Sequence, residues 1–299
     1  MTDIFVNAAG RVWADRGRGL EAADSLGLDE AQVRELAVRL VAQGGRHIDE
    51  ASPCVDVRLH DGMRIHAVLP PVSPEGTLLS IRLPGVAAPG LDDLARSGFF
   101  VGATERAIRQ LLESRANLLI TGAGGCGKTT FLAAMLAAVP STERILAIED
   151  VAELRVSHPH FVSLEARQPN LEGAGEVGLS RLVREALRMR PDRLVVGECR
   201  GAEIRELLAA LNTGHDGGAG TLHANSLADV PSRLEALGAL AGMTDHAVAR
   251  QTVSAIDAVL HLRRDGDRRY LSEWGSFATD PDGRLSIRPR TSDGHHEVE

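Results

Sequence analysis

Residues 121–130 read TGAGGCGKTT and directly follow the apolar run NLLI at 117–120. Glycines let the backbone adopt positive φ angles and turn its N–H groups toward an anion, and a helix that begins at the end of such a loop adds the positive end of its dipole. The apolar run before the loop and the helix-forming TFLAAMLAA after it provide the strand, loop and helix order of a phosphate-binding loop. The stretch therefore predicts a nucleoside triphosphate site in an α/β fold.

Each residue type in this loop has an expected role. Lys128 would reach the β- and γ-phosphates, and the Thr129 hydroxyl would ligate Mg²⁺, so ATP and Mg²⁺ are the expected cofactors. A glycine-rich turn that binds nothing is the alternative, and the agreement of the Gly, Lys and Thr positions with their context disfavours it. The residues expected to contact the nucleotide are Gly122, Gly124, Gly125, Cys126, Gly127, Lys128, Thr129 and Thr130.

The composition limits the fold class and the partners. With 43% hydrophobic but only 3% aromatic residues among 299, the chain can form one large or two ordinary domains around an aliphatic core. A net charge of -8 makes nucleic acid an unlikely default partner. Three scattered cysteines predict neither a disulfide framework nor a zinc site, and favour a reducing cytoplasm. No apolar run approaches the ~20 residues that span a bilayer, so membrane association is expected only through partners.

The pattern of the chain changes near residue 86. Residues 1–85 are expected to form a small α+β domain, and residues 83–90 a Pro- and Gly-containing linker. In residues 86–299, short continuous apolar strands alternate with amphipathic helices, which predicts a mostly parallel, RecA-like sheet covered on both faces. Residues 290–299 form a polar tail that is expected to be disordered. Strands are expected within 3–7, 11–15, 54–71, 77–84, 117–121, 144–150 and 192–198, and helices within 28–45, 102–115, 129–139 and 177–190.

Acidic residues follow two of the expected strands. Glu149 and Asp150 end one apolar strand, Glu153 comes just beyond it, and Glu198 ends another. Ligands of open α/β sheets lie beyond the carboxyl ends of the strands, so one carboxylate would order the water around Mg²⁺ and another would polarise the attacking water. Capping of helix N-termini by these acids is an equally open alternative.

A third polar station is the glycine-rich stretch NTGHDGGAGTLHANS at 212–226, which contains His215 and His223. Two histidines without a third ligand are weak grounds for a metal site. The glycines instead indicate a close approach to phosphate or to another chain element, and the motif alone names no function.

Several long motifs occur in order along the chain: RHIDEASPCVDVRLHDGMRIHAVLPP, GAGGCGKTT, ERILAIEDVAELRVSHPHFVSLEARQPNLEGAGEV, LVREALRMRPDRLVVGECRGAE and LNTGHDGGAGTLHANS. Together they resemble the ATPases of type II and type IV secretion and of type IV pili. Within that family they are most similar to the CpaF/TadA ATPases of tight-adherence (Flp) pilus assembly. The resemblance extends from about residue 45 to about residue 265, which is most of the chain.

The resemblance implies roles for the acidic residues. The stretch IEDVAEL is similar to the Asp box of the family, in which the residue matching Glu153 is the favoured general base, with Glu149 and Asp150 beside it. The stretch VVGE is similar to an atypical Walker B motif, so Glu198 would hold the water shell of Mg²⁺. Thr129, Glu198 and Asp150 are thus the residues expected around the metal.

The resemblance also implies roles for histidines and arginines. The stretch GTLHANS corresponds to the His box, which places His223 near the γ-phosphate, with His215 in the same region. Members of the family work as hexamers in which arginines of the N-terminal domain approach the nucleotide, and Arg58 and Arg82 match such positions. An arginine fork suits a developing phosphate charge, although ordinary surface arginines on strands are frequent. Arg200, just after the Walker B motif, is a further candidate.

Two departures from the family pattern bear on the site. Cys126 stands where pilus ATPases usually have Ser; a thiol beside a helix N-terminus could have a lowered pKa and be oxidisable, although replacement of one small side chain by another is the simpler interpretation. The chain also lacks the tetracysteine zinc module of some relatives, so no metal beyond Mg²⁺ is expected.

The expected function is therefore that of a hexameric cytoplasmic ATPase that lies on the inner membrane through a platform protein and powers pilus assembly or secretion. A Vir-type IV secretion ATPase that exports DNA or protein is the alternative within the family. A RecA-like DNA-dependent motor and a nucleotide-binding scaffold without hydrolysis are the alternatives from other classes. The acidic net charge disfavours the DNA motor, and the complete set of acidic stations disfavours the scaffold.

Overall fold

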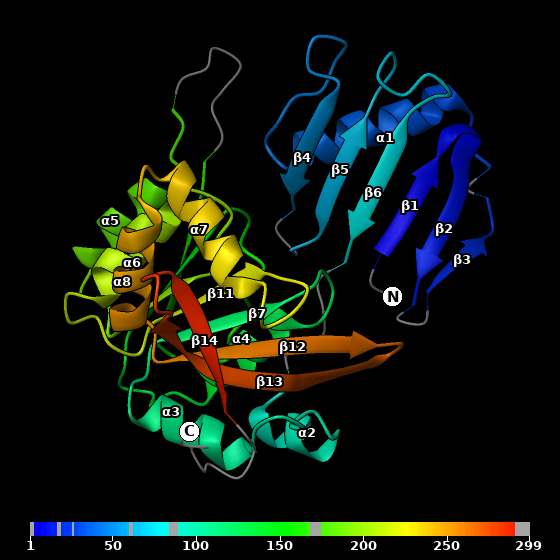
Figure 1. The fold of residues 1–299 in the computed structure, drawn as a ribbon. Coiled ribbons are helices and arrows are strands. Elements are labelled where there is room, and N and C mark those ends of the chain that lie inside the picture. The colour runs from blue at the N-terminus through cyan, green and yellow to red at the C-terminus, as the bar shows by residue number, and fades with distance from the viewer. Residues whose placement is uncertain are drawn as a thin grey trace. The chain divides into compact units, whose positions relative to one another are not determined.

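The computed structural model describes residues 3–16, 19–25, 27–59, 62–83, 89–167 and 175–290. The chain divides into two compact units, Met1–Val86 and Ala87–Glu299, each of which is described by itself (Figure 1). Most of the expected linker at 83–90, nearly all of the expected tail at 290–299, and Asp61 of an expected strand turn lie outside the described residues.

The N-terminal unit is a six-stranded antiparallel sheet with strand order β3-β2-β1-β6-β5-β4 and one long helix against it. The sequence predicted five of its strands and the helix, whereas β3 was not expected. The elements are β1 Asp3–Asn7, η1 Ala8–Gly10, β2 Arg11–Asp15, β3 Leu20–Ala23, α1 Glu30–Gln43, β4 Cys54–Arg58, β5 Arg64–Val68 and β6 Leu78–Arg82.

Helix α1 begins with a capping box. The Asp29 carboxylate accepts the N–H of Gln32 at 2.9 Å, and the Gln32 side chain accepts the N–H of Asp29 at 2.9 Å. Its buried residues Val33, Ala37 and Val41 belong to one hydrophobic cluster with inward-facing residues of β4, β5 and β6. Because side chains alternate along a strand, the residues between these core positions lie on the face of the sheet away from α1.

The C-terminal unit is an eight-stranded sheet with strand order β14-β13-β12-β7-β11-β10-β8-β9. The strands from β12 to β9 are parallel, and β13 and β14 form an antiparallel extension. This architecture confirms the expected α/β fold with a mostly parallel sheet. The strands are β7 Leu118–Gly122, β8 Ile145–Glu149, β9 Phe161–Glu165, β10 Arg193–Val196, β11 Ala219–His223, β12 Ala258–Asp265, β13 Arg268–Thr279 and β14 Leu285–Arg290.

Helices cover both faces of this sheet (Figure 1). Leu118 and Ile120 of β7 pack in one cluster with α2, α3 and α4, whereas Leu119 packs on the other face in a cluster with α5, α6, α7 and α8. Burial on both faces explains why these strands are continuous apolar runs. The helices are α2 Leu91–Arg96, α3 Glu105–Glu113, α4 Lys128–Ala137, α5 Leu179–Leu187, α6 Glu203–Leu211, α7 Val230–Leu240 and α8 Asp245–Ala255.

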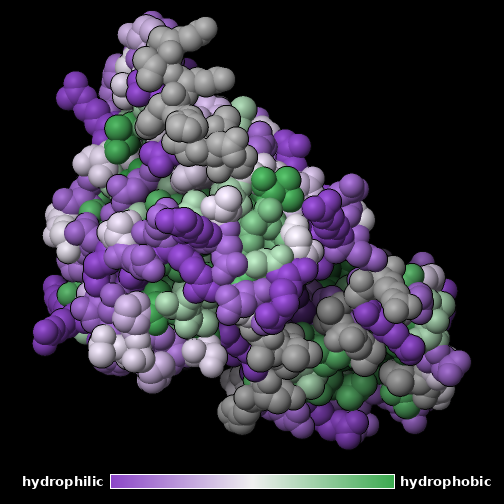
Figure 2. Space-filling view, turned by 90° about the horizontal axis from the view of Figure 1, so that it is seen from below, coloured by the Kyte–Doolittle hydropathy of each residue, from purple (hydrophilic) through white to green (hydrophobic). Residues whose placement is uncertain are grey.

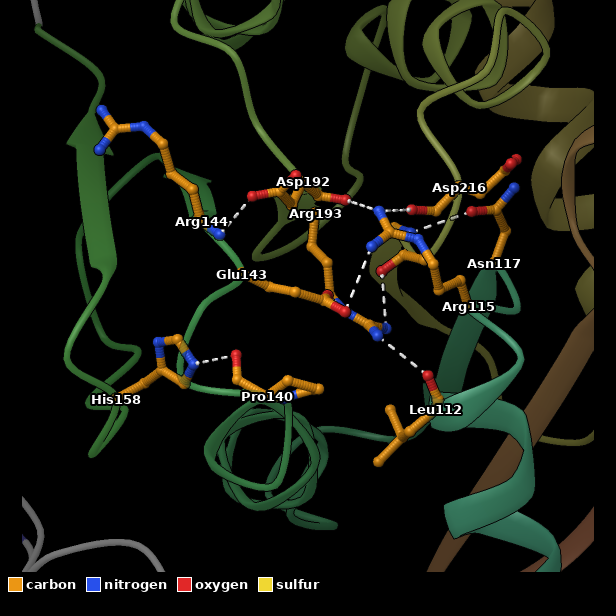
Figure 3. A network of polar contacts seen from close by, with 12 residues as sticks. Leu112, Arg115, Asn117, Pro140, Glu143, Arg144, His158, Asp192, Arg193 and Asp216 are labelled. Carbon is orange, nitrogen blue, oxygen red and sulfur yellow. Dashed lines mark hydrogen bonds and ion pairs between the residues drawn. The ribbon is translucent and has the colours of Figure 1, made fainter.

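A polar network ties elements together at the amino-terminal ends of β8, β10 and β11 (Figure 3). Arg193 is only 2% exposed, and its Nε lies 2.6 Å from Oε2 of Glu143. The other carboxylate oxygen of Glu143 lies 3.2 Å from Nη1 of Arg115, so one acid pairs with two arginines. Arg193 also donates to the Leu112 carbonyl at 2.9 Å, and Arg115 to the Asp216 carbonyl at 3.1 Å. The network thus fixes α3, β10 and the loop before β11 to one another.

Hydrophilic side chains cover much of the face seen from below, and hydrophobic residues show between them in small groups (Figure 2). Among the described residues, the exposed large hydrophobic side chains come from separate elements, as is normal for a folded surface. Every described helix is too short or too polar to cross a bilayer. These exposed side chains are Trp13, Leu20, Val72, Val101, Leu240 and Val253.

Candidate nucleotide site

The glycine loop lies between β7 and α4, which begins at Lys128 as expected. Gly122, Gly125 and Gly127 have φ angles of +148°, +71° and +97°, a region that side chains other than glycine rarely adopt. At Gly122 a Cβ would also lie 2.4 Å from the carbonyl oxygen of Leu262. Gly124 has no such constraint, and a Cβ there would lie 3.6 Å from the His223 ring. The loop thus has the backbone freedom that an anion-binding nest requires.

Lys128 is folded back into this loop. Its side chain is 7% exposed, and Nζ donates to the carbonyl oxygens of Gly122 at 2.9 Å and Ala123 at 3.0 Å. Burial lowers the pKa of the ammonium group, although the charge of Glu198 raises it in part. Because both acceptors are neutral carbonyls, a buried positive charge at the start of a helix remains for an anion to neutralise. Thr129 is half-buried and Thr130 exposed. These residues fit a phosphate group.

Glu198 and His223 face each other beside the loop. Glu198 follows β10 and His223 ends β11, and His223 Nε2 lies 2.9 Å from Oε1 of Glu198. The other carboxylate oxygen accepts from Arg200 Nη2 at 2.6 Å. Burial lowers the pKa of His223, the charge of Lys128 lowers it further, and Glu198 raises it in part. Lys128, Glu198, His223 and Arg200 therefore form one cluster of interacting charges at the carboxyl end of the sheet.

Glu149 is a buried acid at the end of β8. Its side chain is 4% exposed, and Oε1 accepts the backbone N–H groups of Glu153 at 2.9 Å and Leu154 at 3.0 Å. A Cβ on Gly197 would lie 2.6 Å from Cγ of Glu149, so the carboxylate passes where only a glycine leaves room. Glu149 thereby holds the loop that carries Glu153.

Asp150 and Glu153 are exposed acids, and their negative charges act on Arg200 of the cluster. The hydrogen bond with Glu198 raises the pKa of Arg200, and the charges of Asp150 and Glu153 raise it further. Acidic residues expected at two separate strand ends thus both raise the pKa of the same arginine, Arg200. Among the described residues, no group of three or more His, Cys, Asp or Glu side chains is placed to hold a metal ion by itself. Mg²⁺ would therefore need a phosphate or water as a further ligand.

One expectation about this region is wrong, and for Cys126 the structure supports the simpler of the two interpretations. His215 does not share the site with His223, because the two residues flank opposite ends of β11, and His215 Nδ1 instead lies 3.2 Å from the Ala210 carbonyl oxygen. Cys126 does not have a lowered pKa: its side chain is 1% exposed, and burial raises the pKa more than the charges of Lys128 and Arg269 lower it. A thiol close to the buried backbone of Gly122 thus simply fills the position of a small side chain.

Arg58 and Arg82 lie in the N-terminal unit, on β4 and β6. Sequence reasoning missed Arg64, which pairs in register with Arg58 on one side and with Arg82 on the other. All three lie on the face of the sheet away from α1, and Arg82 Nε is 3.9 Å from Oδ1 of Asp3. The alternation of the three strands, taken with their antiparallel register, is the signal that identifies Arg64.

Sequence reasoning also missed two arginines at the glycine loop, Arg264 and Arg269 of the β12–β13 hairpin. Arg269 Nε donates to the Gly125 carbonyl at 3.0 Å, and Arg264 Nη1 lies 3.7 Å from where a Cβ of Gly125 would be. The stretch RRDGDRR at 263–269, with arginines on both sides of an Asp-Gly turn, is the signal in the sequence.

A parallel sheet with a glycine loop, a buried lysine at the start of α4 and acids at the neighbouring strand ends defines a RecA-like α/β protein. The chain matches the family model described as type II/IV secretion system protein over residues 1–281. It therefore belongs to the type II/IV secretion system protein family, as expected.

Relatives of known name agree with this assignment. A protein of Mycobacterium tuberculosis described as a putative conjugal transfer protein is 50% identical over 279 residues, which are 91% of this chain and 79% of the relative. The conjugal transfer protein TrbB of Rhizobium radiobacter is 32% identical over 278 residues, 91% of this chain and 82% of the relative.

Solved structures share the fold. The VirB11 ATPase of the Brucella suis type IV secretion system, crystallised with sulphate, is 25% identical with a TM-score of 0.51, covering 94% of this chain and 93% of that chain. The pilus retraction motor PilT with bound ADP has a TM-score of 0.64 at 20% identity, covering 96% of this chain and 78% of that chain. The latter likeness concerns the fold alone.

Proposed function

We propose that this chain binds ATP with Mg²⁺ and hydrolyses it, and that hydrolysis drives a secretion or conjugal-transfer machine. The observation that carries this proposal is the buried ammonium group of Lys128 inside a loop of left-handed glycines, next to the Glu198–His223 pair. The names of the relatives, which are secretion ATPases and conjugal transfer proteins, support it.

Each residue of the site has a separate role in the proposed reaction. Lys128 and the N–H groups of the loop bind the phosphates, and Glu198, Asp150 and the Thr129 hydroxyl hold Mg²⁺ with its waters. When bound, Mg²⁺ supplies charge neutralisation for the phosphates. Glu153 orients the attacking water, because its carboxylate is exposed on a loop whose backbone Glu149 fixes.

We further propose that the active form is a hexamer in which Arg58 and Arg82 of the N-terminal unit approach a nucleotide, as arginines suit a developing phosphate charge. Movement of the N-terminal unit relative to the core would transmit the work to an inner-membrane partner, which would hold the protein at the cytoplasmic face. Assembly of a CpaF/TadA-type (Flp) pilus is the second candidate process, supported by the motif resemblance of residues 45–265.

Lys128 offers a direct test because it is the only lysine of the chain. An amine-acylating reagent followed by peptide mapping reports on this single side chain and the amino terminus. ATP should protect Lys128 from acylation, and Lys128→Ala should abolish ATP hydrolysis while the far-UV circular dichroism spectrum stays unchanged. Turnover in Lys128→Ala equal to that of the wild type would overturn the assignment.

Two further measurements distinguish the alternatives. An equimolar mixture of Arg82→Ala and Lys128→Ala chains should recover part of the activity if one chain supplies an arginine to the site of another. Stimulation of hydrolysis by single-stranded DNA, falling steeply with salt, would instead favour a DNA-dependent motor.

A further inference from the structure

The β12–β13 hairpin extends past the end of β7 beside the glycine loop. Strand β12 runs parallel to β7 with Leu262 paired to Gly122, so the next residues of β12 continue beyond the strand end alongside the loop. Arg264 and Arg269 stand directly opposite each other in the antiparallel register of the hairpin. They therefore lie on the same face of the ribbon.

Both arginines lie close to the loop. Arg269 Nε donates to the Gly125 carbonyl at 3.0 Å, and a Cβ on Gly127 would lie 3.1 Å from Cδ of Arg269. Arg264 Nη1 lies 3.7 Å from the position of a Cβ on Gly125. Gly127 is thus required both by its φ angle of +97° and by the arginine stem that packs on it.

Arg264 and Arg269 contact different groups from the other two arginines of the hairpin. Arg263 pairs with Glu273 at 3.2 Å, and the Arg268 guanidinium lies over the Tyr270 ring at 5.2 Å, both on the opposite face. Arg269 instead donates to a neutral carbonyl, and within the described part of the chain the acid that Arg264 pairs with, Asp267, is 3.9 Å away. Like charges directly opposite on paired strands repel, so the pair provides a site for an anion.

The position in the sheet indicates which part of a nucleotide would lie here. β7 stands between β11 and β12. Glu198 and His223 follow strands on the β11 side, and they would face the phosphate that is cleaved. The hairpin lies on the β12 side, toward which the rest of the nucleotide must extend.

We propose that Arg264 and Arg269 line the nucleotide site on its β12 side and bind the phosphates that stay with the nucleoside. The inference rests on the proposed function, since it requires a nucleotide in the loop. Two guanidinium groups suit phosphate oxygens, because each offers a planar pair of donors. Contacts to phosphates that are not cleaved contribute equally before and during the reaction, so they lower KM and leave kcat unchanged.

The test measures binding of a fluorescent ADP analogue to the full-length chain, with inorganic pyrophosphate as competitor. Arg264→Ala and Arg269→Ala should each lower the affinity for both ligands roughly tenfold or more, as expected for loss of a charged hydrogen-bonding partner. Arg263→Ala and Arg268→Ala, on the other face of the same hairpin, are the matched controls and should stay within about twofold of the wild type. In steady-state assays KM should rise with kcat retained.

The Arg264→Ala variant distinguishes direct phosphate binding from structural support of the glycine loop. The hydrogen bonds of Arg264 are made within its own turn, including Nε to the Gly266 carbonyl at 2.7 Å, so among the described residues its loss removes no bond to the loop. If the hairpin only props the loop through the Gly125 carbonyl, Arg269→Ala would weaken binding and Arg264→Ala would not. Wild-type affinity in Arg264→Ala would overturn the proposal, as would weaker ADP binding with unchanged pyrophosphate binding. Failure of the proposed function is a different result: the wild type itself would bind no nucleotide, or Lys128→Ala would bind as well as the wild type.

Discussion

His223 ends β11 and Glu198 follows β10, yet the imidazole Nε2 of His223 lies 2.9 Å from Oε1 of Glu198. The contact is possible because β11 and β10 are parallel neighbours, so their carboxyl ends meet at the same edge. His223 is also paired with Gly122 at the start of the glycine loop. The pair therefore couples the acid expected at the metal to the loop expected at the phosphates.

The first prediction concerns the pH dependence of hydrolysis. Burial lowers the pKa of His223 below its ordinary 6.5, so the ring is neutral at pH 7 and takes up a proton only in more acidic solution. Protonation would convert the contact into an ion pair that holds Glu198 and would add a positive charge near Lys128. We expect kcat to fall as the pH drops below 6.5 in the wild type. His223→Asn should lack that acidic limb in a kcat profile, and an identical limb in both proteins would contradict the role of His223.

The second prediction concerns Gly197, which leaves room for Glu149. A Cβ at Gly197 would lie 2.6 Å from Cγ and 3.1 Å from Oε1 of Glu149, so Gly197→Ala should displace the carboxylate that accepts the N–H groups of Glu153 and Leu154. We expect kcat to fall roughly tenfold, the effect of losing about one buried hydrogen bond to a charged group, with KM little changed.

Gly178→Ala is the matched control for this change. Gly178 precedes α5 with a φ of -80°, and a Cβ there would meet nothing within 4 Å. Steady-state kinetics and the melting temperature of both variants are the measurements. An unchanged kcat in Gly197→Ala, with the fold intact, would mean that Glu149 does not position Glu153 for catalysis.

The third prediction concerns the cysteines. Cys54 is exposed, whereas Cys126 and Cys199 are buried and burial raises the pKa of both thiols. At pH 7.5 a small alkylating reagent should therefore modify Cys54 first, and the two buried thiols only after a denaturant is added. Mass spectrometry of tryptic peptides measures the order. Rapid labelling of Cys126 in the native chain, slowed by ATP, would restore the hypothesis of a reactive thiol at the loop.

The parallel core was predictable from sequence because its strands are buried on both faces. Runs such as LLIT in β7 and LVV in β10 are apolar without alternation, which is typical of strands covered on both sides. β3 was not predictable, since its four residues LEAA are all exposed at the edge of the antiparallel sheet and show no alternation. A strand that buries nothing has no hydrophobic pattern to find.

The site residues were predictable where the signal is local and not where it depends on strand pairing. The loop from Gly122 to Lys128 is one contiguous motif. His215 and His223 are only eight positions apart in a stretch expected to be loop and strand, but the pattern did not indicate that His215 would precede the five-residue strand β11 while His223 ends it. Arg269 contacts Gly125 because β12 lies beside β7, a pairing between segments far apart in the chain. No local pattern identifies which strands will be neighbours.

The fourth prediction concerns Glu143, whose carboxylate pairs with Arg193 and Arg115 (Figure 3). Arg193 is 2% exposed, so Glu143→Gln would leave a buried guanidinium without its counter-charge. We expect the free energy of unfolding to fall by about 3–5 kcal/mol, the usual cost of breaking a buried ion pair by removing one partner. The network lies at the end of the sheet away from Glu198 and His223, so nucleotide affinity should be retained in chains that remain folded.

Glu185→Gln is the control for this prediction, because Glu185 pairs with Arg188 at 3.1 Å while both side chains are largely exposed, and it should cost at most about 1 kcal/mol. The chain has two tryptophans, Trp13 in the N-terminal unit and the buried Trp274 in the C-terminal unit. In a Trp13→Phe background, urea unfolding followed by Trp274 fluorescence therefore reports on the unit that contains Glu143. Equal midpoints for the Glu143 and Glu185 variants would mean that solvent, rather than Glu143, compensates the charge of Arg193.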